Sequence, residues 1–182
     1  MFLSFLPLAT NADAHEIHAG LDALYGWDPA SGDRPYIWVR TDKGVLARSF
    51  NPPVVAGVQT KTEQAPSSGV LSLEVILNPV RRSDRGERPL LKGEEVQAWA
   101  RELLEKSGLQ VQENLDSEGY ALWAERISSA PIKSPNKADV VPAHFWRVRV
   151  LASVVDAEKF TAAWQSGIGR KKRYGAGMIL AR

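Results

Sequence analysis

Two histidines, His15 and His18, stand three residues apart in the segment DAHEIHAGLDALYG. If this segment is a helix, both lie on one face, because residues three or four positions apart are neighbours on a helix surface. Asp22 and Tyr25 continue the same face. Imidazole titrates near neutral pH, so this spacing is suited to general acid–base catalysis. A pair of solvated surface histidines is the alternative.

A metal centre is a weaker interpretation of the same residues. The His-x-x-His spacing has no further histidine, cysteine or adjacent pair of carboxylates beside it, and His144, next to Phe145, is typical of a strand edge. The chain has no cysteine, which excludes a thiolate nucleophile, disulfides and cysteine-ligated zinc or iron–sulfur sites. We therefore expect neither a metal nor a small-molecule cofactor.

A second feature with chemical potential is the stretch GIGRKKRYGAG, in which four glycines surround a basic run. It lacks the GKS or GKT ending of a P-loop, and it does not join a first strand to a helix as a dinucleotide-binding turn does. Glycine lets the backbone approach a ligand closely, and lysine and arginine bind phosphates. The pattern favours a nucleic-acid contact over a solvated turn, through Gly167, Gly169, Arg170, Lys171, Lys172, Arg173, Gly175 and Gly177.

Charge is distributed unevenly, although the net charge is only +2. Acidic residues concentrate in 87–118, whereas basic residues cluster elsewhere. The arginines of 81–88 follow an expected strand. Arg147 and Arg149 alternate along another strand, so their side chains point to the same face. Such a surface attracts a polyanion, although a solvated basic turn has the same composition. The predicted RNA-binding arginines are Arg81, Arg82, Arg85, Arg88, Arg147 and Arg149.

A mixed set of helices and strands must position these side chains. Asp13 and Gly26 are suited to begin and end a first helix with an apolar stripe at Ile17, Leu21 and Leu24. Helices are expected at 13–26, 93–108 and 156–167, strands at 3–9, 35–40, 54–60, 70–78, 109–113, 120–125, 144–154 and 178–182, and a Ser-, Pro- and Lys-rich loop at 128–143. The predicted fold class is α+β, with two tandem ferredoxin-like (RRM-like) domains at 1–86 and 87–182.

The apolar opening MFLSFLPLA is interpreted as a first buried strand, because it lacks a basic n-region and NADAHE follows it, and a signal peptide is the weaker interpretation. Nothing approaches the roughly 18 apolar residues of a membrane span. A content of 44% hydrophobic and 24% charged residues is typical of a globular chain. We expect a cytoplasmic protein that does not contact a membrane.

The order of these elements and the glycine-rich ending resemble the CasE endoribonucleases, the CRISPR RNA-processing subunits of type I-E Cascade complexes in the RAMP superfamily. The resemblance runs nearly from end to end. MFLSFLPL is similar to the family's first strand, DAHEIHAGLDALY to its catalytic helix, and NPPVVAGVQT and LEVILNPVRR to its middle segments. EEVQAWARELLEKSGLQV and GIGRKKRYGAGMIL are similar to its most characteristic stretches, and the terminal glycine pattern is the most specific of these.

The resemblance implies roles for three residues. His18 stands where the family has its catalytic histidine, His15 where it commonly has tyrosine, and Lys172 where it tends to keep a lysine in the glycine loop. The implied activity is metal-independent cleavage of CRISPR precursor RNA within the repeat stem-loop, which leaves a 2′,3′-cyclic phosphate. The implied partners are the retained crRNA and other Cascade-type subunits. Which of His15 and His18 is the acid and which the base stays open.

Two other functions are compatible with the sequence. The first is a non-catalytic crRNA-binding scaffold subunit of a CRISPR effector complex, which would not need His18. The second is an α+β protein that binds a small anion or metabolite. It would show neither tight RNA binding nor a steep salt dependence.

Overall fold

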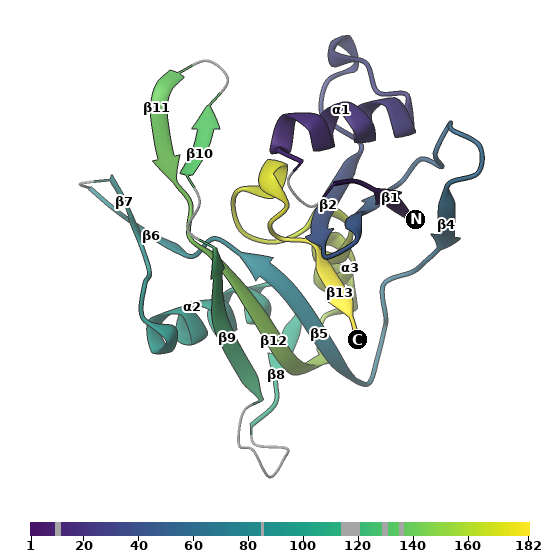
Figure 1. Ribbon diagram of the computed structural model, residues 1–182. Coiled ribbons are helices and arrows are strands. Elements are labelled where there is room, and N and C mark those ends of the chain that lie inside the picture. The colour runs from purple at the N-terminus through teal and green to yellow at the C-terminus, as the bar shows by residue number, and fades with distance from the viewer. Residues whose placement is uncertain (10–11, 85, 114–120, 129–130, 135–136) are drawn as a thin grey trace.

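The structure is a computed structural model that describes residues 1–182 except 10–11, 85, 114–120, 129–130 and 135–136 (Figure 1). The helices are α1 (Ala14–Tyr25), α2 (Gly93–Lys106) and α3 (Ala157–Ser166), with 3-10 turns at Pro29–Ser31 and Lys172–Tyr174. The strands are β1 (Phe2–Pro7), β2 (Tyr36–Thr41), β3 (Gly44–Ser49), β4 (Gln59–Thr62), β5 (Val70–Leu77), β6 (Val80–Ser83), β7 (Gly86–Pro89), β8 (Leu109–Val111), β9 (Leu122–Ser128), β10 (Pro131–Ser134), β11 (Lys137–Pro142), β12 (Phe145–Val154) and β13 (Ile179–Ala181). In the described part of the chain, no helix is long and apolar enough to cross a membrane.

Helix α1 begins and ends where the sequence predicts. The Asp13 carboxylate accepts hydrogen bonds from the backbone N–H groups of His15 and Glu16, and Glu16 accepts one in return from the Asp13 N–H, which is a capping box. Gly26 ends the helix in a left-handed conformation. The predicted apolar stripe is buried, and this fixes which face of the helix packs on the sheet. The stripe consists of Ile17, Leu21 and Leu24.

The first sheet carries α1 on one face. Its strands follow the order β2-β3-β1-β4, and all pairs are antiparallel. Tyr36 and Trp38 of β2 and Val45 and Ala47 of β3 alternate inward and complete the core beneath α1. Strand β2 therefore lies directly under the helix that bears the two histidines.

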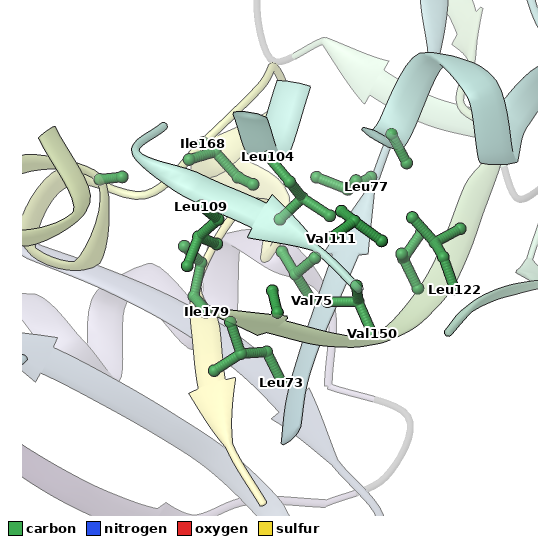
Figure 2. Close-up of a cluster of buried hydrophobic side chains, with 14 of the residues drawn as sticks. Leu73, Val75, Leu77, Leu104, Leu109, Val111, Leu122, Val150, Ile168 and Ile179 are labelled. Carbon is green, nitrogen blue, oxygen red and sulfur yellow. The ribbon is translucent and has the colours of Figure 1, made fainter. Parts of the chain in front are cut away.

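The second sheet has the order β13-β5-β12-β8, and β9 also pairs with β12. Alternate residues of β5 and β12, among them Leu73, Val75 and Val150, form a core with Leu104 of α2 and with residues of α3 (Figure 2). The final strand, β13, pairs with β5, so the chain re-enters the second sheet directly after the glycine-rich loop.

The structure differs from the expected elements in three segments. The sequence did not predict strand β3. It forms a hairpin with β2, in which Thr41 pairs with Gly44 across a two-residue turn, and such a short turn is typical of a hairpin. The expected strand at 54–60 is present only from Gln59, and Val54 and Val55 are exposed in the segment before it. The expected loop at 128–143 contains the hairpin of β10 and β11, whose short β-branched runs the Ser- and Pro-rich composition obscured.

Sheet membership changes between β4 and β5. Strand β5 pairs with β12 and β13, so Val70–Leu77 belong to the second sheet, N-terminal to the predicted division after residue 86. The division into 1–86 and 87–182 stays a prediction, and strand pairing alone would move it to the segment that connects β4 and β5.

A buried arginine joins the two sheets. Arg48 of β3 is 1% exposed, and its guanidinium donates to the carbonyl oxygens of Trp164 (2.9 Å) and Ile179 (3.0 Å), while it forms an ion pair with Glu63. The guanidinium also stacks 4.0 Å from the centroid of the Trp164 ring. Because Trp164 precedes the glycine-rich loop and Ile179 follows it, Arg48 holds both ends of residues 167–177 against the first sheet.

Replacement of Arg48 tests this link. Arg48→Met leaves the Glu63 carboxylate and two carbonyl oxygens without their donor, so the free energy of unfolding should fall by about 3–5 kcal/mol. Urea denaturation followed by tryptophan fluorescence measures this loss. The control Lys106→Met breaks an exposed ion pair with Glu102 and should cost less than about 1 kcal/mol. Equal losses in the two variants would contradict the assignment.

Candidate active site

The glycine-rich loop lies close to α1 and β2 (Figure 1), and His18 of α1 contacts both β2 and the loop. Its Nε2 is 2.7 Å from the carbonyl oxygen of Arg173, and its Nδ1 is 3.0 Å from the Tyr36 hydroxyl oxygen. The ring also makes an edge contact with Trp38, at 5.9 Å between centroids. The predicted catalytic histidine and the predicted basic loop are therefore in direct contact, although 155 positions separate them in the sequence.

Behind His18 lies a chain of polar side chains. The Tyr36 hydroxyl donates to Asp22 Oδ1 at 2.5 Å, and Arg34 donates to both oxygens of Asp22, from Nε at 2.9 Å and from Nη2 at 3.0 Å. The sequence placed Asp22 on the face of His15, but it did not identify Tyr36 or Arg34. The only local indication was that Tyr36 stands at the start of a strand, a position that is equally typical of a core residue.

The pKa values in this network are shifted by burial and by these partners. Burial lowers the pKa of His18, and the charges of Arg34 and Arg173 act in the same direction, whereas the Arg173 carbonyl and the Asp22 carboxylate oppose the shift. Burial also acts to raise the pKa of Asp22, but the hydrogen bonds from Arg34 and Tyr36 outweigh it and lower this pKa. Asp22 is therefore an anion near neutral pH, one hydroxyl group away from His18.

The glycine-rich loop is shaped by close backbone contacts. Ile168 N–H donates to the carbonyl of Gly177, whose own N–H donates to the carbonyl of Ile76. A Cβ atom at Gly177 would lie 2.2 Å from the Ile168 oxygen, and one at Gly175 would lie 2.7 Å from the Trp38 ring. Only glycine allows the loop to close on itself and on β2 at these positions. The glycines thus have a structural role in bringing the Arg173 carbonyl to His18.

Lys172 begins the 3-10 turn at the tip of this loop, one residue before Arg173. It is half-buried, and burial lowers the pKa of its ammonium group. Lys171 before it adopts a left-handed conformation with φ of 62°, which a non-glycine residue rarely adopts. The backbone of Lys172 therefore lies next to the residue whose carbonyl contacts His18, in a constrained turn.

His15 lies outside this network. Its imidazole is exposed and makes no hydrogen bond with any residue that the structure describes. It shares the outer side of α1 with His18, one helical turn away. The structure thus brings His18 and the loop together and leaves His15 facing solvent.

The predicted arginines of 81–88 lie on the hairpin of β6 and β7. Arg81 and Arg88 are exposed and directly opposite each other, an arrangement of like charges that is unfavourable without a counter-ion. Arg88 has an ion-pair contact with Glu95, at 3.6 Å, and Arg82 stands opposite Glu87 across the hairpin. Arg85 lies outside the described residues. The hairpin meets the glycine-rich loop through an ion pair between Arg170 and Glu87.

Arg147 and Arg149 point to the side of the second sheet away from its helices, as their alternation predicts. Both form ion pairs with Glu74, which is 5% exposed, and Arg147 also pairs with Glu125 at 2.9 Å. Arg182 shares Glu74 with them. Their charge is thus partly neutralised by carboxylates, one of which is buried.

A metal-ligand cluster is not found in the described segments, where no three His, Cys, Asp or Glu side chains gather in a way that could hold an ion.

Solved structures of RNA-processing proteins share this architecture. The chain matches a CRISPR endoribonuclease Cse3 bound to a 19-nucleotide RNA with a TM-score of 0.76 and 19% identity over 100% of both chains. It matches Thermus thermophilus Cse3 bound to an RNA representing a pre-cleavage complex with a TM-score of 0.71 and 16% identity, over 100% of this chain and 98% of that one. It matches the CRISPR-associated protein Cas6e from Escherichia coli str. K-12 with a TM-score of 0.66 and 21% identity, again over 100% and 98%. The predicted α+β fold of two tandem ferredoxin-like domains is confirmed.

The family model described as CRISPR associated protein matches residues 3–182. The chain belongs to this CRISPR-associated protein family, in agreement with the resemblance found in the sequence. No curated protein sequence matches the chain.

The closure of the loop can be tested at two glycines with nearly equal φ. At Gly177 (φ 87°) an added Cβ meets the Ile168 oxygen, whereas at Gly57 (φ 81°) it meets nothing within 4 Å. Gly57→Ala should lower the free energy of unfolding by about 1–2 kcal/mol through backbone strain alone. Gly177→Ala should cost at least about 2 kcal/mol more, because of the clash. Chemical denaturation measures both, and equal losses would contradict a closed loop.

Proposed function

We propose that this protein is a cytoplasmic, metal-independent endoribonuclease that cleaves CRISPR precursor RNA within the repeat stem-loop and keeps the mature crRNA as part of a Cascade-type complex. The observation that carries the proposal is the contact between His18 and the basic glycine-rich loop. Support comes from the family match and from the fold shared with Cse3 bound to RNA and with a chain of a CRISPR RNA-guided surveillance complex.

The proposed reaction uses the RNA's own 2′-hydroxyl. This group attacks the adjacent phosphorus, the bond to the 5′ oxygen breaks, and the products carry a 2′,3′-cyclic phosphate and a 5′-hydroxyl. One group must take the 2′ proton and another must give a proton to the departing 5′ oxygen. His18 is the first candidate for such a transfer, and His15 is the candidate second group. Lys172, or a neighbouring arginine of the loop, would stabilise the charge that develops on the phosphorane.

RNA binding is proposed to extend outward from this centre. The β6–β7 hairpin adjoins the loop, because Arg170 of the loop pairs with Glu87 of the hairpin. Phosphates of an A-form stem would act as counter-ions between Arg81 and Arg88. Arg147 and Arg149 are proposed as further contacts, and they would have to share their charge between Glu74 and the RNA.

Cleavage of the cognate repeat RNA tests the catalytic assignment. In EDTA, the wild-type protein should produce fragments ending in a 2′,3′-cyclic phosphate, and His18→Ala should lower the single-turnover rate by about 10²–10⁴-fold. A substrate with a 2′-deoxy nucleotide at the scissile position should not be cut. Gel analysis of end-labelled RNA measures both effects.

His144→Ala is the matched control, because His144 contacts Arg126 on another part of the molecule. It should cleave at the wild-type rate. If the wild-type protein binds repeat RNA tightly without cutting it, the scaffold function holds instead. If it shows no tight, salt-dependent RNA binding, both RNA functions are wrong.

The hairpin's role is tested by the salt dependence of binding. The triple variant R81A/R82A/R88A should bind repeat RNA more weakly, and the slope of log K against log salt should fall by about one for each phosphate that an arginine no longer neutralises. The control K43A/K61A/K106A removes three exposed cations from other places. Fluorescence anisotropy at several salt concentrations measures the slopes, and equal slopes in the two variants would exclude the hairpin from the interface.

A further inference from the structure

The hydrogen bonds around His18 restrict where protons can be. The Arg173 carbonyl can only accept, so at 2.7 Å the facing Nε2 must carry a proton. The Tyr36 hydroxyl has one proton, and the 2.5 Å contact with Asp22 Oδ1 uses it, because Asp22 is held as an anion by Arg34. Tyr36 therefore offers a lone pair to His18 Nδ1 at 3.0 Å, and this nitrogen must also donate.

We propose that Asp22 and Tyr36 are positioning residues that orient His18 and stabilise the form with a proton on each ring nitrogen, so that Nε2 is the nitrogen that delivers a proton in the reaction. This inference rests on the proposed endoribonuclease function for its role in catalysis, but the state of His18 itself does not depend on that function. The Arg34 side chain supports the arrangement, since its two donors orient Asp22 toward Tyr36.

The other states of His18 leave two lone pairs facing each other. If only Nε2 carries a proton, Tyr36 must donate to Nδ1, and then the Tyr36 and Asp22 oxygens face each other at 2.5 Å without a hydrogen. If only Nδ1 carries a proton, the Nε2 lone pair faces the Arg173 carbonyl oxygen at 2.7 Å. Unsatisfied contacts of this kind in a partly buried site cost free energy. The doubly protonated ring satisfies every contact.

The charged and titratable groups that face His18 act in opposite directions. Burial of the ring disfavours the imidazolium, and so do the charges of Arg34 and Arg173, whereas the Arg173 carbonyl and Asp22 favour it; the net effect lowers the pKa of His18. Tyr36 remains neutral, since burial and the adjacent Asp22 raise its pKa. Without Asp22 and Tyr36, nothing in this group except the Arg173 carbonyl would offset the burial of the charged ring. Asp22, together with the Tyr36 hydroxyl that accepts from Nδ1, therefore limits the loss of imidazolium that burial causes.

In the proposed reaction this proton has a defined destination. When RNA displaces the Arg173 carbonyl from Nε2, the N–H of His18 faces the scissile phosphate. As the 2′ oxygen bonds to phosphorus and the bond from phosphorus to the 5′ oxygen breaks, Nε2 gives its proton to the 5′ oxygen. The 2′ proton passes to a separate base, His15 or water, and His18 regains its proton from solvent. Tyr36 and Asp22 do not touch the substrate and act only through the His18 ring.

Nuclear magnetic resonance of protein with ¹⁵N-labelled histidine tests the inference without RNA. The three histidines are assigned with His15→Ala, His18→Ala and His144→Ala. Asp22→Asn removes the charge and Tyr36→Phe removes the acceptor, and each should lower the pKa of His18 by about half a unit or more. Tyr25→Phe is the matched control, because Tyr25 stacks on Tyr36 with centroids 5.6 Å apart but donates to the Ala47 carbonyl. It should leave the pKa of His18 unchanged.

The activity of the same variants separates the two proposals. If Nε2 is the acid, cleavage falls as pH rises through the pKa of His18, so this limb of the pH–rate profile should move to lower pH in Asp22→Asn and Tyr36→Phe but not in Tyr25→Phe. An unchanged pKa of His18 in folded Asp22→Asn and Tyr36→Phe would overturn the positioning role, even if the wild type cleaves. A wild type that does not cleave, with the pKa shifts present, would overturn the proposed function alone.

Discussion

The buried guanidinium of Arg48 is the interaction on which the geometry of the site depends. It lies in the first sheet, yet its hydrogen bonds go to the carbonyl groups on either side of the glycine-rich loop. Burial lowers the pKa of this arginine, and Glu63 opposes that shift. Desolvation of a charged group is expensive, so such an arginine is stable only when its donors are used. The same donors that offset this cost hold the loop beside α1.

Two parts of the chain contribute different kinds of groups to the site. Helix α1 and strand β2 supply titratable side chains, His18, Asp22 and Tyr36, on regular elements that fix their directions. The loop supplies a backbone carbonyl and a set of cations on a path that glycine makes possible. Both parts are fixed by local geometry, the histidine by a capped helix and the loop by its glycine contacts, which suits a centre that must hold a phosphate in one orientation. In the CasE family, which the sequence resembles, a tyrosine commonly stands at the position of His15. In this chain the tyrosine hydroxyl that contacts His18 belongs to Tyr36 of β2.

The arginines outside the loop fall into two groups, and the sequence predicts RNA binding for both. Those of the β6–β7 hairpin face one another on an exposed ribbon, while those of β12 share the carboxylate of Glu74. A carboxylate among arginines orders their side chains, but it also reduces the attraction for phosphate. The small net charge of the chain therefore conceals two arginine clusters with different surroundings, an exposed ribbon beside the loop and a sheet face whose arginines share a buried carboxylate.

The sequence by itself determined the features that arise from residues close together in the chain. The capping box at Asp13, the apolar stripe of α1 and the glycines that close the loop each depend on spacing within about a dozen residues, and the order of elements with the glycine pattern sufficed to indicate the family. Tertiary structure alone decided that Tyr36 lies between His18 and Asp22, that Arg48 joins the two sheets, and that Val70–Leu77 belong to the second sheet. These contacts join segments that are far apart in the sequence, so no local pattern encodes them. They form only when the buried stripes of two sheets and three helices are packed together, since that packing fixes which polar groups are left without water and must bind one another.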